Sequence, residues 1–85
     1  MYHTFYRVLT ALYDTGMQSS KGVYGVHSIE SLRLTREERR ELRGLQSKGY
    51  IYLFEEYVQF TMKGLEDYCN MDDEDFRGAR NNDLH

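Results

Sequence analysis

The chain has 85 residues, of which 40% are hydrophobic, so it is long enough for one domain with a modest core and too short for two. Its formal net charge of −3 argues against a uniformly basic nucleic-acid binder. Residues 1–70, however, hold nine Lys or Arg and nine Asp or Glu, so the excess negative charge lies in residues 71–85. Local clustering of charge, rather than the total, therefore decides which partner fits.

The first predicted element is an amphipathic helix over residues 2–15. Its apolar face consists of four residues at the spacing i, i+3, i+4 and i+7: Phe5, Val8, Leu9 and Leu12. Gly16 is placed to end this helix. Residues 17–22 are typical of a loop, and the β-branched residues among 23–26 indicate a short strand or an extended link.

Two further helices are predicted between residues 28 and 48. Ser28 is a suitable N-cap for a short helix that ends at Leu32. Thr35 followed by Glu38 forms a capping box, in which each side chain accepts a hydrogen bond from the other residue's backbone N–H. This box starts a third helix, which we expect to run without interruption to Lys48.

A β-hairpin is predicted after Gly49, which can adopt the left-handed conformation that ends a helix. Residues 50–54 and 57–61 are aromatic and β-branched runs on either side of the glutamate pair 55–56. Because glutamate disfavours a positive φ, we expect the turn to be wider than these two residues. A last helix is predicted over 61–71, and the polar, acidic residues beyond it are expected to be disordered.

This succession of elements resembles a winged helix-turn-helix domain. Two segments carry the resemblance: Leu42-x-x-Leu45-x-x-Lys48-Gly49-Tyr50-Ile51 and Val58-x-Phe60-Thr61-x-Lys63-Gly64-Leu65-Glu66. In that family the first pattern ends the recognition helix and begins the wing, and Thr-x-Lys-Gly starts the closing helix. The resemblance implies an α+β, mainly α, fold over residues 1–70: a three-helix bundle, a hairpin wing and a C-terminal helix, followed by the acidic tail 71–85.

Four arginines of the third helix fall within about 100° of arc at 100° per residue: Arg36, Arg39, Arg40 and Arg43. Leu42 and Leu45 lie on its far side. The resemblance implies that the arginine side enters the major groove, where the planar guanidinium pairs with phosphates and with guanine. Arg33 and Lys21 are placed to reach flanking phosphates. We therefore predict a DNA-binding regulator of transcription that acts as a homodimer on a two-fold site in double-stranded DNA.

Two alternatives stay open at this point. The charged face can be an ordinary solvated surface, since Glu37 and Glu41 are spaced to pair with basic residues within the helix. The chain can also be a protein-interaction module or a small inhibitor that acts through the acidic residues 55–56 and the tail, which would repel DNA. For the tail itself, competition for the arginines and a role in solubility are both possible. Gly44, inside the third helix, allows either a helix crossing or the approach of a partner.

Some hairpin aromatics are expected to be partly exposed, because alternate residues of a strand face solvent: Tyr52, Phe54 and Tyr57. Such a patch suits a dimer or protein interface, and the alternative for each ring is packing in the core. Tyr2 and Tyr6 of the first helix offer another surface for a dimer.

No catalytic motif is found. The histidines lie in separate segments, no metal-ligand or phosphate-loop spacing occurs, and residues 72–75 lack the pattern of a calcium loop. We therefore expect neither an enzyme nor a bound metal or cofactor. The single cysteine, Cys69, excludes an intramolecular disulfide and fits a reducing compartment. Residues 2–13 predict neither a signal peptide nor a membrane span, so we expect a cytoplasmic protein that makes no membrane contact.

Overall fold

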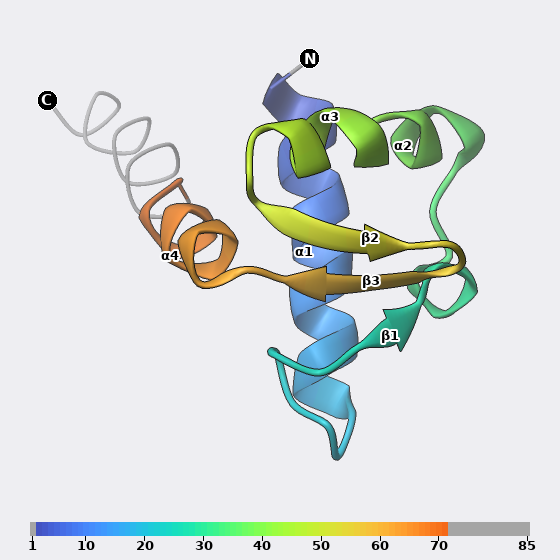
Figure 1. Cartoon of the computed structure of the whole chain (residues 1–85), viewed down its shortest axis with the longest axis vertical. Helices are drawn as coiled ribbons and strands as arrows, with labels where there is room; N and C mark the ends of the chain where they lie inside the picture. The colour runs from blue at the N-terminus through green and yellow to red at the C-terminus, as the bar shows by residue number, and fades with distance from the viewer. Residues whose placement is uncertain (1, 72–85) are drawn as a thin grey trace, which may run out of the picture.

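A computed structural model of the chain describes residues 2–71. Its elements, in chain order, are α1 (Tyr2–Gln18), β1 (His27–Ser28), η1 (a 3₁₀ helix, Ile29–Leu32), α2 (Arg36–Arg40), α3 (Leu42–Ser47), β2 (Ile51–Phe54), β3 (Tyr57–Phe60) and α4 (Met62–Met71). Figure 1 shows α1 as a central post, with α2 and α3 across one end and the β2–β3 hairpin across its middle. The fold is α+β and mainly helical, as predicted. The expected disorder of the tail concerns residues 72–85, which lie outside the described residues.

Helix α1 supplies the centre of the core. Val8, Leu9 and Leu12 are all buried, which confirms the predicted apolar face. The expectation that Gly16 ends the helix is wrong, because α1 continues for two more residues. A Cβ at Gly16 would lie only 2.6 Å from the Cα of Val23. The glycine is therefore needed for the close approach of the returning loop.

The three strands form one antiparallel sheet in the order β1-β3-β2. For residues 23–26 we expected either a short strand or an extended link. The first strand lies immediately after them, at residues 27–28, where His27 pairs with Val58. Residues 19–25 instead form successive turns, in which Gly22 has a φ of +82° and Gly25 N–H donates to Gly22 O. Strand β1 thus forms at the residues that can pair with the distant strand β3.

The hairpin turn consists of only the glutamate pair 55–56, because Phe54 pairs directly with Tyr57. The expectation of a wider loop is therefore wrong, and Glu55 accepts a φ of +48°. Register explains this result, since shifting one strand by one residue would turn its buried side chains to solvent. The side chains that hold the register in the core are Ile51, Val58 and Phe60.

The capping box forms as predicted. Thr35 N donates to Glu38 Oε1 at 2.9 Å, and Glu38 N donates to Thr35 Oγ1 at 3.1 Å. The single helix expected over 35–48 is nevertheless divided at Glu41, whose N–H donates to Glu38 O in a tighter, 3₁₀-type turn. Gly49 follows α3 with a φ of +81°, as predicted for the helix end.

The Thr-x-Lys-Gly motif has a clear structural role at the junction of hairpin and α4. Thr61 Oγ1 donates to Gly49 O at 2.6 Å and accepts a hydrogen bond from Gly64 N at 2.8 Å. It thereby caps α4 and ties the helix to the start of the hairpin. Gly64 is required because a Cβ at this position would overlap the carbonyl group of Tyr50.

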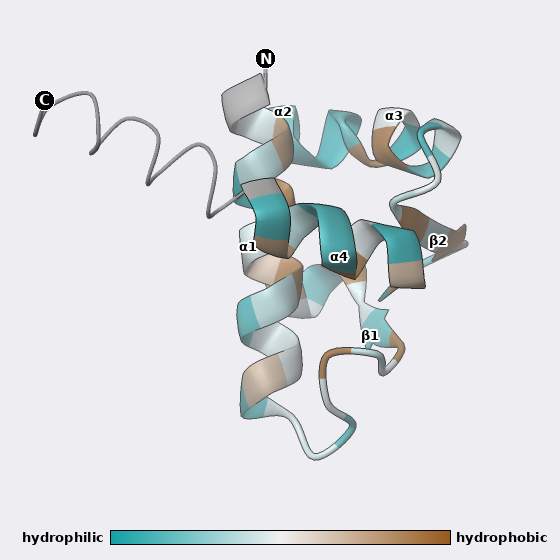
Figure 2. Cartoon of the chain, turned by 90° about the vertical axis from the view of Figure 1, so that its left-hand side faces the viewer, coloured by the Kyte–Doolittle hydropathy of each residue, from teal (hydrophilic) through white to brown (hydrophobic). Residues whose placement is uncertain are grey.

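The outer turns of α4 are hydrophilic, whereas β2 is hydrophobic (Figure 2). None of the helices in residues 2–71 combines the length and the apolar character that a membrane span requires.

Candidate nucleic-acid interface

The predicted arginine surface lies on α2, α3 and the turn before them. All five of its side chains are exposed: Arg33, Arg36, Arg39, Arg40 and Arg43. Within residues 2–71, ion pairs join Arg7 to Glu38 and Lys63 to Asp67, and neither pair involves these five guanidinium groups. We call Arg36, Arg39, Arg40 and Arg43 the arginine stripe. Its charges are available to an anionic partner.

The opposite side of α3 is anchored in the core. Leu42 and Leu45 are both buried, as predicted. A Cβ at Gly44 would lie 3.4 Å from the Cζ of Phe5, so this glycine faces α1 and serves the crossing of the two helices. The two buried leucines fix the rotation of α3 about its own axis. Arg43 therefore faces solvent because of this packing and not because of charge.

Arg33 is the C-cap of η1 and has a left-handed backbone, with φ 54° and ψ 46°. Its N–H donates to Glu30 O, which closes the 3₁₀ turn that Ser28 caps at the other end through a bond from Ser31 N. A left-handed conformation costs a non-glycine residue about 1–2 kcal/mol. The turn therefore places Arg33 just before α2 in a strained backbone conformation. No local sequence pattern predicts this conformation.

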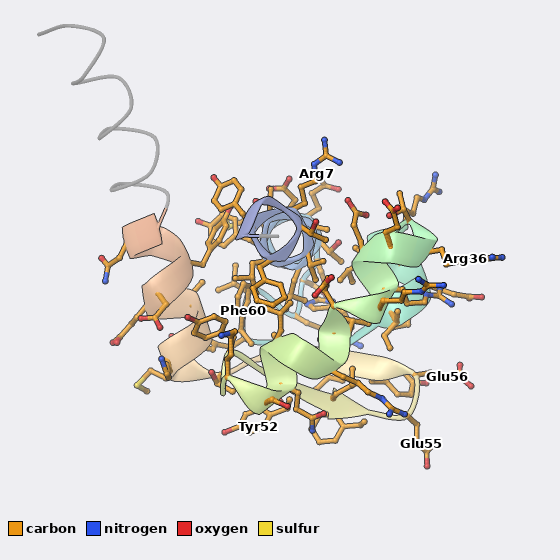
Figure 3. All side chains as sticks on the ribbon, turned by 90° about the horizontal axis from the view of Figure 1, so that it is seen from above. Arg7, Arg36, Tyr52, Glu55, Glu56 and Phe60 are labelled. Carbon is orange, nitrogen blue, oxygen red and sulfur yellow. The ribbon has the colours of Figure 1, made fainter. Side chains whose placement is uncertain are left out.

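The hairpin tip lies on the same side of the molecule as Arg36, below α2 in the view of Figure 1. Figure 3 shows Arg36, Glu55 and Glu56 all extending outward there, while Arg7 points from α1 in another direction. The tip is fixed to the body by the bond from Ile29 N to Glu56 O at 2.8 Å. Its two carboxylates lower the positive potential near the stripe, so an anionic partner would approach α2 and α3 rather than the tip.

Lys21 does not join the arginine surface, contrary to expectation. The loop after α1 lies at the opposite end of α1 from α2 and α3 (Figure 1). The ammonium group of Lys21 donates to Val26 O at 3.4 Å and thus belongs to that loop. Sequence reasoning also overlooked Arg7, whose 3.9 Å contact with Glu38 links α1 to the capping box of α2.

The other chemically active side chains have structural surroundings. His27 of β1 is buried, with its Nε2 3.1 Å from Gly22 O. The carboxylate of Asp67 accepts a hydrogen bond from Lys63 and so raises the pKa of Lys63 above its ordinary value. In the part of the chain that the structure describes, no three His, Cys, Asp or Glu side chains gather into a metal-binding group.

Comparison with known proteins finds no match for the chain: no protein-family model, no curated protein and no solved structure resembles it significantly. The geometry and charge of α2 and α3 are therefore the basis on which function can be argued.

Proposed function

We propose that the chain is a small DNA-binding protein, a regulator of transcription, that places residues 35–48 in the major groove of double-stranded DNA. The observation that carries this proposal is the arginine stripe: four exposed guanidinium groups that take no part in the ion pairs of residues 2–71. Glu37 and Glu41, which are spaced to pair with basic residues of this segment, form no ion pair with the four arginines in residues 2–71.

The element order supports a winged-helix fold. A long first helix, a short strand, three short helical segments and a hairpin follow one another, and the first strand pairs with the second strand of the hairpin. Helices α2 and α3, divided at Glu41, have five and six residues, and an α-helix is about 10–12 Å across. The major groove is about 12 Å wide, so a helix of this diameter fits it.

The chemistry of arginine supports DNA over other anions. A guanidinium fork pairs with two oxygens of a phosphate or with O6 and N7 of guanine, and it stays charged at all physiological pH values. Arg33, in the turn before the stripe, would contact the phosphate backbone. A homodimer would present two such surfaces to a two-fold site, since protein symmetry mirrors operator symmetry.

Salt dependence is the first test. If the four arginines of the stripe neutralise four phosphates, log K should fall with log salt at a slope of about −3 to −4. Raising the salt from roughly 50 to 200 mM would then weaken binding about a hundredfold. Fluorescence anisotropy with a random duplex measures this slope, and a flat response would overturn the proposal.

Charge reversal locates the contacts. Arg40→Glu should weaken DNA binding by tenfold or more, because it removes one contact and adds a repulsion. Lys21→Glu changes the net charge equally at the far end of α1 and serves as the matched control. Equal losses from both variants would show that only total charge matters and would sink the assignment to α2 and α3.

A second candidate is a protein-interaction module, and the exposed carboxylates of residues 55–56 favour it. The pair of changes Glu55→Lys and Glu56→Lys separates the two functions. For a DNA-binding protein the double variant should bind DNA at least as tightly, since it removes a repulsion beside the stripe. For an interaction module it should abolish binding to a basic partner and leave DNA binding unaffected.

A further inference from the structure

Helix α2 carries three of the four arginines of the stripe, yet none of its side chains is buried. The apolar residues nearest to it in the chain lie on either side of it: Leu34 is partly buried against the core before the helix, and Leu42 is buried after it. Because the helical segment is divided at Glu41, the packing of Leu42 fixes α3 and not the rotation of α2 about its own axis. Apolar packing therefore does not explain how the arginines of α2 keep their direction.

The one side chain of α2 that points inward is a carboxylate. Glu38 is the only residue of Arg36–Arg40 that is not exposed, and its side chain is 15% exposed. An amphipathic helix normally places an apolar side chain at such a position. A carboxylate that loses water there needs hydrogen bonds or an opposite charge to offset the loss. Glu38 has both, because Oε1 accepts a hydrogen bond from Thr35 N at 2.9 Å and Oε2 lies 3.9 Å from Nη1 of Arg7.

Arg7 supplies the side of this contact that belongs to α1. Its side chain is 61% exposed, and Figure 3 shows that it points in a different direction from Arg36. Its chain neighbour Val8 is buried, so the backbone of Arg7 is held by the core. Of the two ion pairs in residues 2–71, the one between Arg7 and Glu38 joins two helices, whereas the other lies within α4. The contact thus connects α2 to the helix at the centre of the core.

We propose that Arg7 and Glu38 are positioning residues of the DNA-binding surface. Their contact sets the rotation of α2 against α1 and so directs the arginines of α2 outward, while neither residue touches DNA. This assignment rests on the proposed function and deepens it. A carboxylate beside the stripe would by its charge alone weaken DNA binding. Positioning and simple electrostatics therefore predict opposite effects when that charge is removed.

Glu38→Gln separates the two effects. Glutamine keeps the capping box but loses the attraction to Arg7. Although the change removes a negative charge, we expect it to weaken binding to a random duplex about threefold in fluorescence anisotropy, the scale of a partly exposed ion pair. The matched control is Glu37→Gln, an exposed carboxylate in the same first turn of α2, which should bind DNA at least as tightly as wild type. Tighter binding by both variants would overturn the proposal.

A double-mutant cycle distinguishes positioning by Arg7 from a direct phosphate contact. Arg7→Gln alone should weaken binding by a similar factor, and Arg7→Lys should retain most of the affinity. In the Glu38→Gln background, Arg7→Gln should cost no more than Lys21→Gln, because the contact is already lost and only distant charge remains. An equal loss in both backgrounds would show that Arg7 contacts DNA itself and would refute its positioning role.

Hydrogen exchange of the free protein tests the contact without DNA. Arg39 N–H donates to Thr35 O at 2.9 Å and reports whether the first turn of α2 stays closed. Arg7→Gln and Glu38→Gln should each speed its exchange about threefold relative to Glu37→Gln. Urea denaturation of each variant verifies that the global free energy of unfolding is unchanged.

The two assays separate the failure of this inference from that of the proposed function. Faster exchange together with a flat salt response in the DNA assay refutes DNA binding and leaves the contact between α1 and α2 in place. Unchanged exchange together with the expected salt slope refutes the positioning role and leaves DNA binding in place.

Discussion

The backbone conformation at the base of the β2–β3 hairpin and that at its tip are stabilised in different ways. At the base, Gly49 adopts a φ of +81°, and Thr61 joins Gly49 to α4 through hydrogen bonds of 2.6 and 2.8 Å. At the tip, Glu55 holds a φ of +48° without a glycine, and its side chain is exposed. The base is fixed by residues that suit their own positions, whereas the tip is fixed by the register of buried residues elsewhere in the strands.

This difference determines what each end can tolerate. The base connects α3, the hairpin and α4, so a change there moves the leucines of α3 and with them the arginine stripe. The tip connects only two strands that are already aligned by their core side chains. We therefore expect large losses at the base and a gain at the tip.

The largest effect is expected from Gly64→Ala. The added Cβ would overlap the Tyr50 carbonyl, which is backbone and cannot rotate away. We expect the free energy of unfolding to fall by about 3 kcal/mol or more, measured by urea denaturation. Gly44→Ala is the control, because a Cβ there meets only the Phe5 ring and gains helix propensity. If both variants were equally stable, the close contact at the base would be unimportant.

A smaller loss is expected from Thr61→Val, which keeps the shape of the side chain and removes its hydroxyl. The cap of α4 and the bond to Gly49 are lost together, so unfolding should become easier by about 1–2 kcal/mol. Thr61→Ser retains the hydroxyl and should keep most of the stability. A loss in Thr61→Ser as large as that in Thr61→Val would show that the hydroxyl and its hydrogen bonds are not what stabilises this position.

At the tip we expect a substitution that increases the free energy of unfolding. Glu55→Asn should stabilise the fold by about 0.5–1 kcal/mol, because asparagine tolerates a positive φ that glutamate disfavours. Glu56→Asn removes the same charge from a neighbour that lacks a positive φ, and it should leave stability unchanged. Thermal unfolding of the two variants side by side separates backbone strain from charge. A gain of similar size in both would make repulsion between the carboxylates the cause.

The base of the hairpin could be predicted from the sequence, and the tip could not. Gly49 and the capping box of Thr35 and Glu38 act within a few residues, so their signals are local. The turn at 55–56 depends on Val58 and its neighbours keeping their places in the core. The same reason explains the position of the first strand, since residues 27–28 become a strand only by pairing with β3.

The arginine surface also has features that the sequence predicts and features that it does not. Helix periodicity predicts that Arg36 and Arg43 share a side, and both are exposed. Periodicity could not predict that the helix tightens at Glu41 or that Arg33 has a left-handed backbone. Nor could it predict that Lys21 lies at the far end of α1, because that depends on where a loop folds back.

The smallest effect is expected from the ion pair at the base. The Lys63 ammonium donates to Asp67 at 2.8 Å, and this raises the pKa of Lys63 above 10.5. Since the folded pKa is raised, the pair contributes stability below about pH 10.5 and loses it as the pH rises through the folded pKa. Asp67→Asn should return the pKa of Lys63 toward 10.5, as followed by NMR titration, while stability at neutral pH changes little because the lysine is exposed. A large loss at neutral pH would show that charge, and not the backbone of residues 49–64, holds the base together.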